Sequence, residues 1–303
     1  MNRNRAHLLL LLTAIIWGLA FVAQVSGGKY MSTFALNFHR NLVAGLFLLV
    51  VLLFIPRLRG VGKDLKATLV GGTICGVVLS IAMALQQYGL QFTTAGKGGF
   101  ITALYIILVP IGGILLHHSI SKKTWLSVFI AAIGLYFISV PKGGDGSVNI
   151  GDVLIFISAI GFATHILIID HFSNRVDGVA MSCIQFFVAA FMSLLYILPT
   201  GQSLVENYSL TLPSILYLGL LSSGVGFTLQ IVGQHYSEPT IVSLILSLES
   251  VFGLIGGIFI LGEVVTPREW LGCLLMFIAI VVAQIPLAKL LKFGKKHEKS
   301  SLS

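Results

Sequence analysis

Three charged residues lie well inside long apolar stretches of this 303-residue chain: Arg40, Lys97 and Glu249. The chain has 19 Lys and Arg and 11 Asp and Glu in all, and the rest lie at the ends of these stretches or between them. A charged side chain in hydrocarbon costs about 2.5–3.5 kcal/mol on insertion scales and is usually kept because it has a partner or a function. These three residues are therefore the first candidates for a functional site.

Arg40 lies about six residues into the second apolar stretch. A guanidinium group at this depth could bind a carboxylate or a phosphate through two parallel hydrogen bonds. Two structural interpretations stay open: the long side chain reaches outward to the membrane surface, or it pairs with Glu249 as a brace between helices.

Lys97 stands among Gly96, Gly98 and Gly99, which weaken a helix and predict a late start or a break. A cation beside an unwound segment and a helix N-terminus could bind an anionic group of a substrate. The alternative is an interfacial lysine that contacts lipid headgroups.

Glu249 is about nine residues into the ninth apolar stretch, close to the expected middle of the bilayer. A charged carboxylate at that depth is costly to desolvate, so Glu249 is the best candidate for a group that binds an amine or carries a coupling proton. The alternative is a salt bridge to Arg40 or Lys97 that only fixes helix packing.

Other polar and aromatic residues in the apolar stretches are weaker candidates for the same site. His39 and His165 suit a proton relay, since histidine titrates near neutral pH, although a structural hydrogen bond is the commoner role. Further candidates for a substrate pathway are Gln86, Gln230, Trp17 and Tyr105.

A membrane-embedded enzyme that uses Glu249 with His39 or His165 is the alternative to a carrier. We find no nucleophile elbow, metal-binding motif or phosphate-binding loop, so no cofactor or metal is expected.

The elements that must position these residues are membrane-spanning helices. Hydrophobic residues make up 56% of the chain and charged residues 10%, against roughly 25% charged in soluble domains. Windows of about 20 apolar residues predict ten spans in an all-α membrane protein. They are Leu8–Gln24, Phe34–Ile55, Ala67–Tyr88, Thr94–Leu116, Thr124–Val140, Val153–Ile169, Val179–Leu198, Leu212–Gly233, Thr240–Leu261 and Trp270–Ala288.

Lys and Arg in the connecting segments predict the orientation. Fourteen lie on the side of the two chain ends and four on the other side, where Lys97, close to the end of its span, is counted and Arg40 is left out. The positive-inside rule then places both termini in the cytoplasm of a plasma or inner-membrane protein. The same bias accounts for the pI of 9.5, so we expect no nucleic-acid partner. Membrane lipid is an expected partner. Cys75, Cys183 and Cys273 all lie in spans and predict neither disulfides nor a metal site.

The sequence repeats itself at a spacing of 144 to 145 residues. Ile111-Gly112-Gly113-Ile114 matches Ile255-Gly256-Gly257-Ile258, and Trp125-Leu126 matches Trp270-Leu271. We predict two repeats, residues 7–140 and 151–289, followed by a basic cytoplasmic tail at 290–303. Because each repeat has five spans, an odd number, the second must insert upside down relative to the first, and inverted repeats are typical of transporters. The paired glycines are expected to serve close helix packing.

Several of these motifs resemble the EamA-type branch of the drug/metabolite transporter superfamily. They are Trp17-Gly18, the run Thr94 to Thr102 with Pro110, and Glu249 followed by Gly262-Glu263. The resemblance covers Leu8 to Ala288 and implies a carrier of small metabolites, in many relatives an exporter, with a central cavity between the halves. The chain departs from the pattern at His118-Ser119, where many relatives have Gly-Glu, and at Ser250, where many have Pro.

The sequence therefore predicts a multi-pass transporter and not an enzyme. It would move amino acids or related small polar solutes by alternating access, driven by a gradient, with proton coupling and a homodimer left open. Arg40 and Lys97 would bind an anionic group of the substrate. Glu249 would bind an amine or carry the proton.

Overall fold

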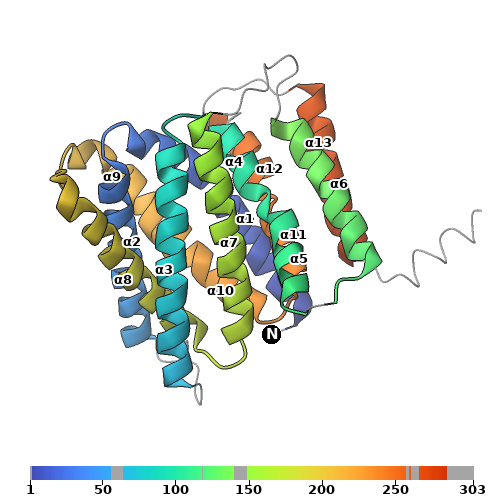
Figure 1. Cartoon of the computed structure of the whole chain (residues 1–303), viewed down its shortest axis with the longest axis horizontal. Helices are drawn as coiled ribbons and strands as arrows, with labels where there is room; N and C mark the ends of the chain where they lie inside the picture. Colours follow the sequence, from blue (N-terminus) through green and yellow to red (C-terminus); the bar gives the residue numbers. More distant parts are fainter. Residues whose placement is uncertain are drawn as a thin grey trace, which may run out of the picture.

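A computed structural model shows a helical bundle in which successive helices run up and down (Figure 1). It describes residues 2–55, 64–93, 95–117, 119–139, 149–256, 259–260 and 266–284. Within these ranges the regular structure is helical throughout, with no strand. The first seven α-helices are α1 (Arg3–Gly28), α2 (Thr33–Phe54), α3 (Leu65–Gly89), α4 (Ala95–Ala103), α5 (Tyr105–Leu115), α6 (Lys122–Ser139) and α7 (Ile150–Phe172).

The second half has a similar series. It contains α8 (Gly178–Ile197), the 3₁₀ turn η2 (Leu198–Thr200), α9 (Tyr208–Leu216), the π-helix η3 (Tyr217–Phe227), α10 (Thr228–Gln234), α11 (Pro239–Leu246), α12 (Glu249–Gly256) and α13 (Pro267–Gln284). Polar caps start several of these helices. Asp64 and Asp177 accept backbone N–H groups at the starts of α3 and α8, and Asn149 forms a capping box with Asp152 at the start of α7.

Eight helical segments are long and apolar enough to cross a membrane. They are Arg3–Gly28, Thr33–Phe54, Leu65–Gly89, Gly98–Leu115, Ile150–Phe172, Gly178–Thr200, Tyr208–Gln234 and Pro239–Gly256. The all-helical membrane fold predicted from the sequence is thus confirmed. The predicted fifth and tenth spans correspond to α6 and α13, which border residues outside the described ranges, so the total of ten spans stays a prediction.

Two of the predicted spans are interrupted near their middles. The fourth is divided into α4 and α5 at Leu104, and the ninth into α11 and α12 at Ser247 and Leu248. At each interruption a backbone N–H bonds the carbonyl three residues back, from Leu104 to Ile101 and from Leu248 to Ile245. The prediction that the glycines around Lys97 break the helix is wrong, because α4 runs through them. In lipid an unbroken helix satisfies its own backbone, which offsets the low helix propensity of glycine.

α1 and α7 each contact several other helices of the bundle. α3 packs against α7 and α8, and α2 packs against α8 and η3, whereas α6 and α13 lie side by side at one edge (Figure 1). α1 crosses α12 closely at Gly18, where an added Cβ would lie 2.7 Å from the Glu249 carbonyl oxygen and from the Gly253 nitrogen. This crossing brings the first and ninth predicted spans together in the centre of the bundle.

Candidate functional site

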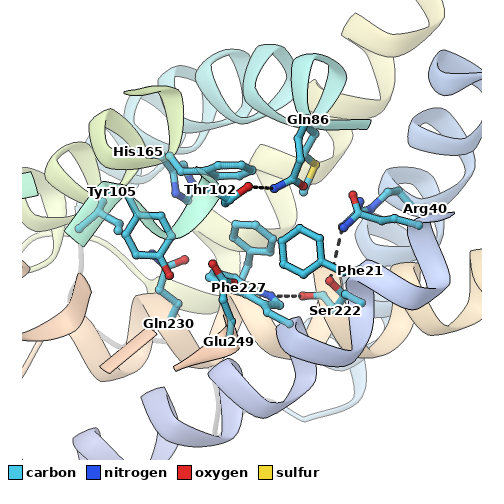
Figure 2. Close-up of a pocket in the computed structure, with 16 residues that line it drawn as sticks. Phe21, Arg40, Gln86, Thr102, Tyr105, His165, Ser222, Phe227, Gln230 and Glu249 are labelled. Carbon is cyan, nitrogen blue, oxygen red and sulfur yellow. Dashed lines mark hydrogen bonds between the residues drawn. The ribbon is translucent and has the colours of Figure 1, made fainter. Parts of the chain in front are cut away.

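A cavity lies in the centre of the bundle where these helices meet (Figure 2). The space in and around it that no protein atom fills is about 500 Å³, including the open solvent at its mouth. Its walls combine aromatic rings with a few polar and charged side chains. The lining residues are Trp17, Ala20, Phe21, Gln24, Arg40, Met83, Gln86, Thr102, Tyr105, Phe162, His165, Ile166, Ser222, Phe227, Gln230 and Glu249.

The two helix interruptions place a polar side chain each in this cavity. Tyr105 is the first residue of α5 and Glu249 the first residue of α12, and their exposed fractions are 2% and 3%. The Tyr105 hydroxyl and Glu249 Oε1 are buried atoms without a hydrogen-bond partner in the described part of the chain. The two groups are close enough to interact electrostatically. Because a buried unpaired oxygen is costly, this pair is suited to a ligand that donates hydrogen bonds.

Arg40 comes from α2 and approaches the cavity from another side (Figure 2). Its Nε donates to Ser223 Oγ at 3.3 Å and its Nη2 donates to Ser222 Oγ at 3.4 Å, both from the π-helix η3. The side chain is buried, which argues against the interpretation that it reaches the membrane surface. No ion pair joins Arg40 to Glu249, although both side chains are described. The brace between Arg40 and Glu249 that the sequence left open is therefore not formed.

Amide and imidazole groups complete the polar part of the cavity. Gln86 Nε2 donates to Thr102 Oγ1 at 2.9 Å, and His165 Nε2 lies 3.0 Å from Gln185 Oε1. Gln230 Oε1 is buried and, among the described atoms, has no hydrogen-bond partner. Gln24 Oε1 is likewise buried and has no hydrogen-bond partner among the described atoms. The cavity thus presents several hydrogen-bond acceptors that a bound solute could satisfy.

Aromatic rings form the apolar wall. Trp17 packs on Phe227 with ring centroids 4.5 Å apart and planes tilted by 50°, and its Nε1 donates to the Ser222 carbonyl at 3.1 Å. Phe227 also contacts His165 edge to face at 5.7 Å. These contacts fix Trp17 against η3, the same helix that bonds Arg40. The π-helix η3 therefore holds both Arg40, through the hydroxyls of Ser222 and Ser223, and Trp17, through the Ser222 carbonyl.

Seven of the eight residues predicted from the sequence as substrate-binding line this one cavity. They are Arg40, Glu249, Trp17, Gln86, Tyr105, His165 and Gln230. The backbone of Lys97 lies in α4, but its side chain lies outside the described part of the structure. His39 is elsewhere: its Nε2 lies 2.7 Å from the Leu204 carbonyl oxygen. Of the two histidines named in the enzyme alternative, His39 is therefore not placed with Glu249, whereas His165 lines the same cavity as Glu249.

Several residues of the cavity wall were not predicted from the sequence. Phe21, Phe162 and Phe227 are aromatic residues in apolar spans, where most such residues pack against helices or lipid, so their types gave no signal. Gln24, Thr102 and Ser222 are polar residues in spans and could have been found by that property. Phe100 of α4 packs against two apolar clusters and is not among the residues that line the cavity.

Comparison with known proteins gives the family. A model of the EamA-like transporter family matches residues 4–140 and again residues 149–284. The chain belongs to the EamA-like transporter family. An uncharacterized transporter of Archaeoglobus fulgidus is 31% identical over 285 residues, covering 94% of this chain and 87% of the relative. The resemblance drawn from the sequence motifs is confirmed, and so is the prediction of a multi-pass membrane transporter and not an enzyme.

Two further relatives are more distant. A probable glucose uptake protein, GlcU, of Priestia megaterium is 23% identical over 300 residues, covering 92% of this chain and 97% of the relative. A solved crystal structure superposes with a TM-score of 0.76 at 14% identity, covering 93% of this chain and 97% of that chain. At this level of identity the structural likeness shows a shared fold alone.

Proposed function

We propose that this EamA-like transporter carries a small polar solute with a protonated amine and an anionic group, such as an amino acid or a related compound. The observation that carries the proposal is that a basic side chain, Arg40, and an acidic one, Glu249, are buried in one cavity and do not form an ion pair with each other. A solute that brings both charges would satisfy both residues: the amine would lie at Glu249 and Gln230, and the anionic group at Arg40. Lys97 would attract the anionic group on its way in.

The mechanism we propose is alternating access between two inverted repeats, residues 7–140 and 151–289, with ten spans in all and a basic tail at 290–303. The arrangement of the cavity supports this. Gln86 and Gln230 are 144 residues apart, as are Tyr105 and Glu249, and all four line the cavity. The interruptions at Leu104 and Leu248 have the same spacing. Corresponding positions of the two repeats would thus meet at one site that either side of the membrane can reach in turn.

A sugar is the second candidate solute. The relative named as a probable glucose uptake protein favours it, and so does a cavity that combines the Trp17 ring with the amides of Gln24, Gln86 and Gln230. A neutral sugar would leave the charges of Arg40 and Glu249 without counter-charges, and this is why we rank it second. In either case Glu249 is also our candidate for the group that carries a coupling proton.

A thermal-shift screen followed by counterflow tests the proposal. Purified protein is heated with single amino acids, organic acids, amines and hexoses, since a ligand at 100 times its Kd stabilises the bound state by about 2.7 kcal/mol. The stabilising solute, in labelled form, is then added to preloaded proteoliposomes, where a carrier accumulates it chemically unchanged. We expect an amino acid or a similar zwitterion to be the solute.

Glu249→Gln is the decisive variant in this assay. Loss of one partner of a buried charge pair typically costs about 2–5 kcal/mol, so the variant should bind the zwitterion at least about tenfold more weakly and lose most counterflow. Glu206→Gln, at an exposed position, is the matched control and should behave as wild type. Wild-type counterflow by a correctly inserted Glu249→Gln protein would refute the role given to Glu249, and stabilisation by hexoses alone would favour the sugar.

A further inference from the structure

At one end of the bundle, the end of α3 and the start of α7 are in tight contact. A Cβ added to Gly89 would lie 2.8 Å from the Gly151 carbonyl oxygen and 2.6 Å from Ile155 Cγ1. One turn beyond, Thr93 Oγ1 donates to Asp152 Oδ1 at 3.1 Å. The two helix ends are therefore joined by backbone-to-backbone packing and by a side-chain hydrogen bond.

A second tight contact joins the end of α10 to the start of α1. A Cβ added to Gly233 would lie 3.1 Å from the Ala6 carbonyl oxygen and 3.0 Å from Leu10 Cγ. Beyond it, His7 Nε2 lies 3.2 Å from Ser237 Oγ. This contact again consists of a glycine, a carbonyl, an aliphatic side chain and a side-chain hydrogen bond.

The two contacts use corresponding positions of the two repeats. Gly89 and Gly233 are 144 residues apart, and so are Thr93 and Ser237. On the partner helices the spacing is 145 residues: Ala6, His7 and Leu10 of α1 correspond to Gly151, Asp152 and Ile155 of α7. Every residue of the first contact thus has its equivalent in the second, and each plays the same geometric part.

The two contacts lie at opposite ends of the bundle. The first is at Gly151, at the start of α7. The second is beside the other end of α7, because His235 Nδ1 lies 2.8 Å from the Ser173 carbonyl oxygen. Ser173 comes 22 residues after Gly151 along the helix, which is a rise of about 33 Å at 1.5 Å per residue. Figure 1 shows the same arrangement, with α1 beginning at the lower edge and α7 beginning at the upper edge.

We infer that these contacts are the two gates of the transporter: a Gly89 gate, formed by Gly89, Thr93, Gly151, Asp152 and Ile155, and a Gly233 gate, formed by Gly233, Ser237, Ala6, His7 and Leu10. The inference rests on the proposed alternating access. Both contacts are formed in this structure, and Gln86 and Gln230, which precede Gly89 and Gly233 by one helical turn, line the cavity. Transport then requires each gate to open while the other stays closed, and glycine at both positions lets the helix ends meet.

The gates are tested by adding one carbon to each glycine. In a cysteine-free background we place a reporter at Ala20→Cys, a small residue of the cavity wall, and measure labelling by a membrane-impermeant maleimide in sealed vesicles of both orientations. Gly89→Ala should raise the labelling rate several-fold from the side of α7's start only. Gly233→Ala should raise it several-fold from the opposite side only. Gly96→Ala is the matched control, because an added Cβ there meets nothing within 4 Å.

Two variants that add no bulk control for the possibility that the alanine variants misfold. Thr93→Val and Ser237→Ala remove the hydrogen bond of each gate without adding bulk, and they should shift labelling in the same two directions by a smaller factor. Unchanged labelling in all four variants, in vesicles where the protein still performs counterflow, would overturn the gates and leave the proposed function intact. Side-specific labelling without any counterflow would support the gates and count against the proposed solute.

Discussion

At the residue scale, the central feature is a guanidinium and a carboxylate that share a buried cavity without contacting each other. Burial of either charge is expensive, and each would be easier to keep if it paired with the other. Arg40 bonds two serine hydroxyls of η3 instead, and Glu249 Oε1 has no partner within the described residues. Charged residues within membrane-spanning segments usually face the bundle interior or a cavity and mark a substrate or ion pathway.

The shape of the Arg40 head group should matter as well as its charge. Arg40→Lys keeps the positive charge but replaces a planar fork of five donors with an ammonium group of three, so it cannot bond Ser222 and Ser223 and also bind a carboxylate through two parallel hydrogen bonds. We expect the apparent affinity for the solute to fall by roughly tenfold, with the maximal counterflow rate less affected. Arg175→Lys, at an exposed arginine outside the cavity, should change neither. Equal affinity in Arg40→Lys and wild type would show that Arg40 does not bind the anionic group.

Residue types in the spans predicted most of the polar side of the site. Arg40, Glu249, His165, Gln86 and Gln230 are costly in lipid, so their presence alone pointed to a cavity. The aromatic wall was harder, since Trp17 and Tyr105 were proposed but Phe21, Phe162 and Phe227 look like any other apolar residue in a span. Which aromatic rings face a cavity depends on helix rotation, and a sequence with apolar residues all round each helix does not fix that rotation.

At the element scale, the interrupted helices and the α1–α12 crossing position the site. The apolar stretches predicted the spans, but the positions of the interruptions were not predicted. The glycines around Lys97 looked like the weak point, yet the break comes at Leu104. Local propensity is a weak guide here, because backbone hydrogen bonding in lipid and packing against neighbouring helices outweigh it.

The crossing of α1 and α12 offers a matched pair of glycine variants. Gly18→Ala would place a Cβ 2.7 Å from backbone atoms of Glu249 and Gly253, whereas Gly253→Ala would meet its nearest atom at 3.5 Å. We expect Gly18→Ala to destabilise the protein by about 1–3 kcal/mol and to lower counterflow by displacing Glu249, since overpacking forces backbone shifts. Gly253→Ala should be close to wild type in a thermal-unfolding assay in detergent. A stable, fully active Gly18→Ala protein would contradict this account of how α12 is positioned.

At the scale of the whole molecule, the account depends on two repeats that share one site. The EamA-like family model matches the chain twice, and the residues that meet in the cavity and at the two gates recur at spacings of 144 or 145 residues. Ten spans, opposite orientation of the halves and cytoplasmic termini are what the sequence predicts for such a chain. The two corresponding gate contacts could be recognised only from the structure, because residue type alone does not predict which helices contact each other.

The most direct test is whether the transported solute protects the cavity from both sides of the membrane. The Ala20→Cys protein is labelled with an impermeant maleimide in sealed vesicles of each orientation, with and without saturating solute. We expect the solute to slow labelling in both orientations, because one cavity binds it whichever gate is open. Efficient counterflow of a solute that protects Ala20→Cys from neither side would show that the solute crosses elsewhere and would contradict the account.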